Sequence, residues 1–426
     1  MSSSKSRFLK AIPHDRVGLV QRILLALYIV ALFLLIPLLP ELNQLAEALL
    51  PPRLIPGTVT AFYLGVGLFV AGGCCCGRPP RRWWRLLALV TLTVLAVAGI
   101  WALRDAAPAR ALYLPAYGVL ALLALPVYRR REPDAGAYWC AGLLASLVGT
   151  LTEVTRWLLL EGQFSFGAVA LRAAGGWLMI GLVAWVLRPP AYAAASSPRS
   201  ARLALRLAVV QLLLLGLCIS TTAERLQGIT ARWPALAWLQ RANQGMIEYG
   251  HRYHDPEIGF FYSRLSLPEL EEQDRTRSLA VAAILDAYPF PDREAEFLAE
   301  YPPARDPFVY EVRHRIDRRD RYLFYANRLE DYEQEEWWVP FLTIAYQEHR
   351  ILELLFPRTW NASGYTVSDR NLNRMRAYHD PAASFHNETD RHLVAPWRET
   401  HFWGMIVVGL TLCWLWYRHH QRVSVS

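Results

Sequence analysis

The sequence is poor in lysine and cysteine. Its only lysines are Lys5 and Lys10, and the other 43 basic residues are arginines, which is typical of a bacterial coding bias. The six cysteines are Cys74, Cys75, Cys76, Cys140, Cys218 and Cys413. None of them lies between residues 224 and 400, so no disulfide framework holds that polar segment together.

Sequence signatures of common catalytic sites are also missing. The chain contains no G-x-S-x-G sequence, no P-loop and no H-E-x-x-H sequence. The sequence therefore gives no support to a serine hydrolase, a P-loop nucleotide hydrolase or a metalloprotease of the H-E-x-x-H type. We predict neither a cofactor nor a resident metal.

The net charge of +8 conceals two oppositely charged regions. Residues 224–400 carry 22 arginines against 29 aspartates and glutamates, whereas the remainder carries 23 basic and 8 acidic residues. The positive excess lies mostly in short loops between apolar stretches, where membrane topology explains it. We therefore expect no nucleic-acid partner.

Eight apolar stretches are each about long enough to cross the ~30 Å hydrocarbon core of a bilayer. They span residues 19–40, 58–76, 85–103, 111–128, 137–160, 166–187, 203–222 and 401–417. The pattern predicts a multi-pass membrane protein whose first partner is the lipid bilayer. Glycines on the second and sixth stretches predict close helix–helix approach, namely Gly57, Gly65, Gly67, Gly72, Gly73, Gly175, Gly176 and Gly181.

Basic residues fall on alternate sides of this predicted bilayer. The side that holds both termini carries 18 of them, and the short loops of the other side hold only Arg53, Arg104 and Arg110. Because cytoplasmic loops are rich in lysine and arginine, both termini are predicted to be cytoplasmic. We expect a bacterial inner-membrane protein with a seven-span domain (1–223), a periplasmic α-helical domain (224–400), and a transmembrane anchor with a short tail (401–426).

Signals for helix starts recur within the polar segment. Ser266 precedes Pro268, Asp306 precedes Pro307, and Ser368 precedes a short helical pattern. We expect helices at about 232–253, from 266 onward, and at 307–329, 337–356 and 368–378. Strand-like alternation is scarce, so the segment is predicted to be helical.

The fifth and sixth predicted spans contain charged residues, and such residues inside a membrane usually have a partner or a role. Glu153 and Arg156 are three residues apart on the fifth span, and Arg172 lies at similar depth on the sixth. We expect them to form a cluster facing the interior of the bundle. It is either a buried ion pair that fixes helix register or a polar site for an anionic lipid or glycan-lipid head group.

The same region resembles the VanZ-like membrane protein family. The resemblance rests on Glu153-x-x-Arg156, a short outer loop, and a following helix with Gly175-Gly176 and Gly181, and it covers about residues 20–190. The family pattern is E-x-x-Q followed by N-x-x-G-x-x-x-G, so Arg156 stands at the Gln position and Arg172 near the Asn position. The usual Asp-Lys-His of an earlier loop is replaced by Pro51-Pro52-Arg53. The resemblance implies a cell-envelope membrane protein and assigns no catalytic residue.

Two further candidates lie in the polar segment. His251, His254 and Asp255 have a spacing that could supply metal ligands or an acid–base pair from one helical turn, or could simply end a helix. The run from Glu311 to Arg321 is predicted to be mostly a solvated helix face, with Glu311 and Arg315 paired in solvent. Arg319 instead falls on its apolar face and would need an acidic partner or a bound anion.

We interpret the chain as an all-α polytopic membrane protein of about eight spans, with a helical extracytoplasmic domain inserted before the last span. The leading function is a non-enzymatic or accessory role at the cell envelope, contacting a lipid-linked glycan, another anionic envelope component or other envelope membrane proteins. Two alternatives stay open, an integral-membrane glycan or lipid transferase and a transporter. The transporter is less favoured because the charges at depth lie near one leaflet only.

Overall fold

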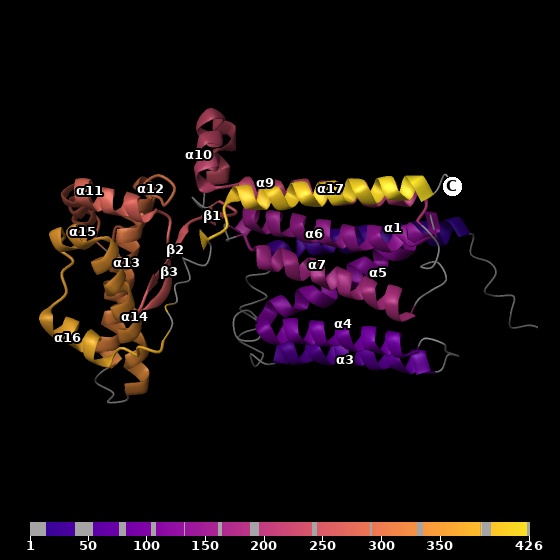
Figure 1. The fold of residues 1–426 in the computed structure, drawn as a ribbon, viewed down its shortest axis with the longest axis horizontal. Coiled ribbons are helices and arrows are strands. Elements are labelled where there is room, and N and C mark those ends of the chain that lie inside the picture. Colours follow the sequence, from indigo (N-terminus) through magenta and orange to yellow (C-terminus); the bar gives the residue numbers. More distant parts are fainter. Residues whose placement is uncertain are drawn as a thin grey trace, which may run out of the picture. The chain divides into compact units, whose positions relative to one another are not determined.

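The computed structural model divides into two compact units. One comprises residues 1–217 and 403–426, and the other comprises residues 218–402. The structure describes residues 14–38, 54–75, 82–103, 108–131, 133–160, 164–187, 196–240, 245–289, 292–329, 335–383, 385 and 393–423. Both units are mostly helical, as Figure 1 shows.

The first unit is a bundle of long helices that lie side by side (Figure 1). They are α1 (His14–Leu34), α3 (Leu54–Cys75), α4 (Arg82–Leu103), α5 (Tyr113–Arg131), α6 (Gly136–Leu160), α7 (Phe166–Gly181), α9 (Pro198–Ser220) and α17 (Glu399–Val423). Shorter turns are η2 (Ile36–Leu38), η3 (Pro108–Leu112) and the π-helical η4 (Leu182–Leu187). Short connections between successive helices, such as those from α5 to α6 and from α6 to α7, favour antiparallel packing of neighbouring helices.

Six of these helices are long and apolar enough to cross a membrane. The six segments are Val17–Leu38, Arg110–Arg130, Gly136–Leu160, Phe166–Trp185, Pro198–Ser220 and Glu399–His419. The other two predicted spans coincide with α3 and α4, which contain the shorter apolar segments Leu54–Val66 and Leu89–Trp101. Leu27, Leu217 and Leu412 are each at least 60% exposed on the unit, as suits helices that face lipid.

Glycines set the closest helix contacts around α7. A Cβ added at Gly175 would lie 2.4 Å from the carbonyl oxygen of Leu114 on α5, and one at Gly176 would lie 2.7 Å from Cβ of Ala145 on α6. The predicted close approach is therefore confirmed at these two glycines. It is wrong at Gly57 and Gly65, because a Cβ there would meet nothing within 4 Å.

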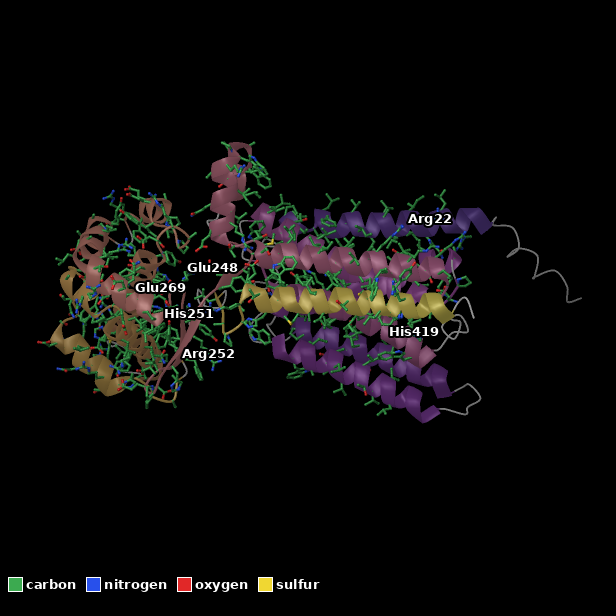
Figure 2. The ribbon with its side chains drawn as sticks, turned by 45° about the horizontal axis from the view of Figure 1, so that its top comes forward. Arg22, Glu248, His251, Arg252, Glu269 and His419 are labelled. Carbon is green, nitrogen blue, oxygen red and sulfur yellow. The ribbon has the colours of Figure 1, made fainter. Side chains whose placement is uncertain are left out.

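Basic helix ends gather at one end of this bundle. Figure 2 shows Arg22 of α1 and His419 of α17 at the same end. Arg130, near the end of α5, lies so close to Gly18 of α1 that a Cβ there would be 2.8 Å from its Nη1. Three basic stretches that are distant in sequence therefore share one side of the unit.

The second unit combines helices with four short strands. Its helices are α10 (Ala223–Arg232), η5 (Pro234–Gln240), α11 (Leu267–Ala287), α12 (Glu294–Glu300), α13 (Pro307–Leu329), α14 (Glu335–Leu355), α15 (Pro357–Ala362) and α16 (Asp369–Tyr378). Its strands are β1 (Glu248–Tyr249), β2 (His251–Asp255), β3 (Gly259–Ser263) and β4 (Leu393–Val394). β2 and β3 form an antiparallel hairpin, and β1 pairs in parallel with β4.

Three predicted helix starts in this unit, at Ser266, Asp306 and Ser368, are confirmed. Ser266 and Glu269 form a capping box at the start of α11, and Ser368 caps α16 by accepting from Asn371 N. Asp306 Oδ1 accepts from Val309 N at the start of α13. The predicted fourth helix corresponds to α14, which has Pro340 in its interior.

The predicted helix over 232–253 is wrong. α10 ends at Arg232, and residues 251–255 form strand β2. Pro234 cannot continue the hydrogen-bond pattern of α10, and Gly259, with φ +80°, provides the left-handed turn residue that leads into β3. In β2 the exposed Arg252 is followed by Tyr253, which packs against the core, as strand alternation requires.

The core of the second unit is built around α13 and α14, which run side by side. Phe308, Val312, Ile316 and Leu323 of α13 are all buried, which confirms the predicted apolar face. They pack in one cluster with apolar residues of α14 such as Leu342. At ~25 cal/mol per Å² of apolar surface, burial of such side chains is the main favourable contribution to the stability of a domain of this size.

Within this second unit, hydrogen bonds tie the last turn of α9 to the first turn of α17. Ser220 Oγ donates to Glu399 Oε1 at 2.9 Å, and Arg225 Nη1 donates to the same oxygen at 2.6 Å. Tyr249 Oη donates to the carbonyl of Ile219 at 3.0 Å. The two chain passages that connect this unit to the long helices thus lie together.

Candidate functional site

The most polar site of the helix bundle is centred on Glu153 of α6, whose side chain is fully buried. Its Oε1 accepts from Arg156 Nη2 at 2.5 Å and from the backbone N of Ser165 at 2.9 Å. Its Oε2 accepts from Arg156 Nε at 3.1 Å and from Arg172 Nη1 at 2.6 Å. Each oxygen therefore accepts two hydrogen bonds, and three of the four bonds come from guanidinium groups.

Arg172 of α7 enters the cluster from the neighbouring helix. Its side chain is only 3% exposed, and its guanidinium lies over the ring of Tyr113 with 4.3 Å to the centroid. Its Nη1 also donates to the carbonyl of Gly149 at 3.3 Å. Its Nε is buried without a hydrogen-bond partner in the structure.

Local sequence explains why the cluster fits between the helices. A Cβ at Gly149 would lie 2.9 Å from Cβ of Arg172, so a glycine there leaves room for the arginine. Ser165, whose backbone N binds Glu153, is also the N-cap of α7 and fixes where that helix begins. Nearby, Tyr117 Oη and Thr152 Oγ1 are 2.5 Å apart and link α5 to α6.

The structure thus brings Glu153, Arg156 and Arg172 together. Arg156 is the most accessible of the three, with a side chain 20% exposed. Two guanidinium groups share one carboxylate, an arrangement that satisfies the acid completely. Such a cluster can hold helices α6 and α7 in register, and it presents positive groups to an anion that approaches from the Arg156 side.

The histidine candidates do not form the predicted site. His251 and His254 lie on strand β2, where residues three apart point to opposite faces, so the expected spacing on one helical turn is wrong. The His254 ring packs on Phe260, with 4.7 Å between centroids. Asp255 closes the β2–β3 turn by accepting from the backbone N of Glu257 and Ile258.

His251 instead lies beside the start of α11. Figure 2 shows His251 together with Glu269, the acidic residue of the capping box. Hydrogen bonds from Ser266, with a smaller contribution from His251, lower the pKa of Glu269. Among the described residues no group of three His, Cys, Asp or Glu side chains could hold a metal ion.

Arg319 is completely buried on the core side of α13. Its Nε donates to Asp320 Oδ1 at 2.7 Å and its Nη2 donates to the carbonyl of Tyr365 at 2.7 Å, while its Nη1 is buried without a hydrogen-bond partner. The acidic partner is therefore the next residue in the chain. Burial, together with the charge of Arg319, lowers the pKa of His349 on α14 to about 4.

The charged run on α13 is more deeply buried than its sequence indicates. Glu311 and Arg315 are 3% and 2% exposed, so their predicted pairing in solvent is wrong. Glu311 accepts from Ser263 Oγ at 2.6 Å, and Arg315 donates to Glu348 of α14 at 3.1 Å. Burial raises the pKa of Glu311.

Sequence reasoning missed the buried ion pairs between α13 and α14 because the paired residues are distant in the chain. Arg315 and Arg318 both contact Glu348, whose side chain is fully buried. Glu348 stands in a polar stretch of α14, between Gln347 and His349, and its helical spacing alone does not connect it to α13. Such a buried layer holds two helices in one relative position.

Comparison with known proteins assigns no function to these sites. No family model, no curated protein and no solved structure matches the chain. The resemblance to VanZ-like proteins therefore stays a prediction. Pro51, Pro52 and Arg53, which replace the usual motif of that family, lie outside the described residues.

Proposed function

We propose that the protein is a multi-pass membrane protein of the bacterial cell envelope with an accessory, non-enzymatic role. In this role, the Glu153–Arg156–Arg172 cluster binds an anionic group, such as the head group of a lipid or of a lipid-linked glycan. Six helices of sufficient length and apolarity support the membrane location. The VanZ-like resemblance supports the cell envelope.

One observation carries the non-enzymatic part of the proposal. Both oxygens of Glu153 already accept two hydrogen bonds each, and the side chain is fully buried. A general base needs an oxygen within reach of the proton that it removes from a substrate. A transferase that uses Glu153 would first have to break several of these bonds.

The donors around the carboxylate support the binding part of the proposal. Planar guanidinium groups are suited to two-point binding of carboxylate and phosphate. Arg172 retains a buried Nε without a hydrogen-bond partner, and Arg156 is 20% exposed. An anion bound at Arg156 would add charge-assisted hydrogen bonds without displacing Arg172 from Glu153.

Orientation forms part of the same proposal. With the basic helix ends of α1, α5 and α17 on the cytoplasmic side, both termini are cytoplasmic and residues 224–400 are periplasmic. Glu153 then lies less than two helical turns from the outer end of α6. The anionic group would come from the outer leaflet.

Lipid retention by the intact protein tests the binding site. We expect Arg156→Gln to retain several-fold less phosphatidylglycerol than the unchanged protein when both are purified in the same detergent and measured by native mass spectrometry. Arg110→Gln is the matched control, because Arg110 is an exposed arginine on η3, just before α5. Equal retention by all three proteins would refute the proposed site, provided that their unfolding temperatures agree.

A further inference from the structure

The hairpin made by α10 and η5 exposes large apolar side chains. Ile229 is 41% exposed, Trp233 59% and Trp238 46%. Pro234, Ala235 and Ala237 beside them are exposed as well. Tryptophan is the costliest of these residues to leave in water, so a surface with two of them indicates a partner.

The inner face of this hairpin is already occupied. Ala223, Leu226 and Thr230 of α10 are buried, and α10 packs chiefly on η5. In Figure 1, α10 stands apart from helices α11 to α16 of the same unit. The exposed tryptophans are therefore not part of the core that α13 and α14 form.

Chain connectivity fixes where the hairpin begins and where it returns. Only Thr221 and Thr222 separate the last residue of α9 from the first residue of α10. The returning chain comes back to the same point, because Met246 N donates to the carbonyl of Thr221 at 2.7 Å. A Cβ at Gly245 would lie 2.6 Å from Ala223 N, so glycine permits this close return.

We propose that the α10–η5 hairpin is an interfacial membrane anchor whose tryptophans lie in the head-group layer beside the end of α9. The hairpin leaves from and returns to the end of an apolar helix of spanning length, which is where a bilayer surface would lie. Tryptophan is enriched at this depth because its ring is apolar and its N–H is polar. The inference does not depend on an anion bound at Arg156.

The charge of the hairpin agrees with a lipid partner. Residues 223–240 contain Arg225 and Arg232 but only one acidic residue, Glu224, whereas the polar segment as a whole is acidic. Arg232 is exposed at the end of α10, beside Trp233. An arginine next to an exposed tryptophan suits anionic lipid head groups.

Photocrosslinking in a bilayer tests the proposal. The full-length protein would carry benzoylphenylalanine at Trp233 or at Trp238 and would be reconstituted in nanodiscs of phosphatidylethanolamine and phosphatidylglycerol. The matched control carries the same group at Leu279, which is 78% exposed on α11. After irradiation, mass spectrometry identifies what is attached to each labelled peptide.

We expect lipid adducts at positions 233 and 238, with at least several-fold less lipid at position 279. A covalent dimer in place of lipid adducts would overturn the proposal and identify a second copy of the chain as the partner. Equal lipid labelling at all three positions would overturn it as well. So would the absence of any adduct at positions 233 and 238.

Discussion

At the scale of single residues, buried charges distinguish this protein from an ordinary apolar bundle. Glu153 and Arg172 in the first unit, and Arg319 and Glu348 in the second, are each at most 2% exposed. A charge removed from water costs several kcal/mol unless its partners are retained. Substitutions at these positions should therefore act on stability before they act on any activity.

Removing the charge of Glu153 tests whether its cluster is structural. We expect Glu153→Gln to destabilise the folded protein by about 3–5 kcal/mol, because Arg156 and Arg172 would lose their shared carboxylate. The measurement is the unfolding temperature of the purified protein in detergent, together with its abundance in membranes.

Glu272→Gln is the control for that experiment. Glu272 pairs with Arg275 on the surface of α11, where both side chains are more than half exposed, so its loss should cost less than about 1 kcal/mol. An unchanged unfolding temperature for Glu153→Gln would contradict the structural role. It would reopen the transferase alternative, in which this carboxylate is chemically active.

His349 predicts an acid-sensitive step in stability. Its pKa in the folded protein is about 4, below its ordinary value of 6.5, because of burial and the charge of Arg319. Glu353 raises this pKa by a smaller amount, and Arg376 lowers it slightly further. The unfolded chain therefore gains a proton near pH 6.5 that the folded chain takes up only near pH 4. Stability should fall over this interval as pH is lowered, by on the order of 2 kcal/mol at pH 5.

The check is the unfolding temperature followed by circular dichroism from pH 7.5 to pH 5. His349→Phe should lose part of the decrease, since phenylalanine keeps the ring contact with Trp360 and cannot be protonated. His379→Phe removes a histidine that stacks on Tyr346, and it should keep the whole decrease. Identical pH profiles for the two variants would show that His349 is not responsible.

At the scale of elements, helix starts were predictable and strand pairing was not. Ser266 and Ser368 indicate the starts of α11 and α16 because they cap these helices, and capping depends only on residues within one turn. For the β2–β3 hairpin the local signal is limited to turn residues such as Asp255 and Gly259, and β1 pairs with β4, which lies near the other end of the unit's sequence. Pairing between distant segments cannot be read from the spacing of one segment alone.

The candidate sites likewise divide into those that depend on neighbouring elements, which were predictable, and those that depend on distant segments, which were not. Glu153 and Arg172 could be brought together from sequence because α6 and α7 are adjacent helices joined by a short loop. The buried layer of Arg315 and Glu348 joins residues 33 positions apart whose contact depends on how α13 packs on α14. His251 was misplaced because a helix was expected where the chain forms a strand.

Helix packing gives a prediction with an internal control. Gly175→Ala should destabilise the bundle, because its Cβ would lie 2.4 Å from a backbone oxygen of α5 that cannot move by itself. Gly65→Ala places the same methyl group in open space on α3 and should be neutral or stabilise by up to about 1 kcal/mol.

Thermal unfolding of the two variants in one detergent makes the comparison. We expect a loss of about 1–3 kcal/mol for Gly175→Ala, which is the usual cost of overpacking a close contact. If the two alanine variants had equal stability, α5 and α7 would not be as closely packed as the structure describes.

At the scale of the whole molecule, the account depends on the helix bundle lying in a membrane. Six helices satisfy the length and composition of membrane spans, and basic helix ends share one side of the bundle. The second unit, residues 218–402, follows one candidate span and precedes another. The central proposal is that this unit lies outside the cytoplasm. The proposed lipid site and the proposed interfacial hairpin are both interpreted on the basis of this placement.

Labelling of single cysteines in intact cells tests that proposal most directly. In a variant without native cysteines, Leu279→Cys places an exposed thiol on α11, and Pro133→Cys places one in the exposed turn between α5 and α6. With a membrane-impermeant maleimide, we predict labelling at position 279 in cells with a permeable outer membrane, and labelling at position 133 only after lysis. The reverse pattern would contradict the proposed topology.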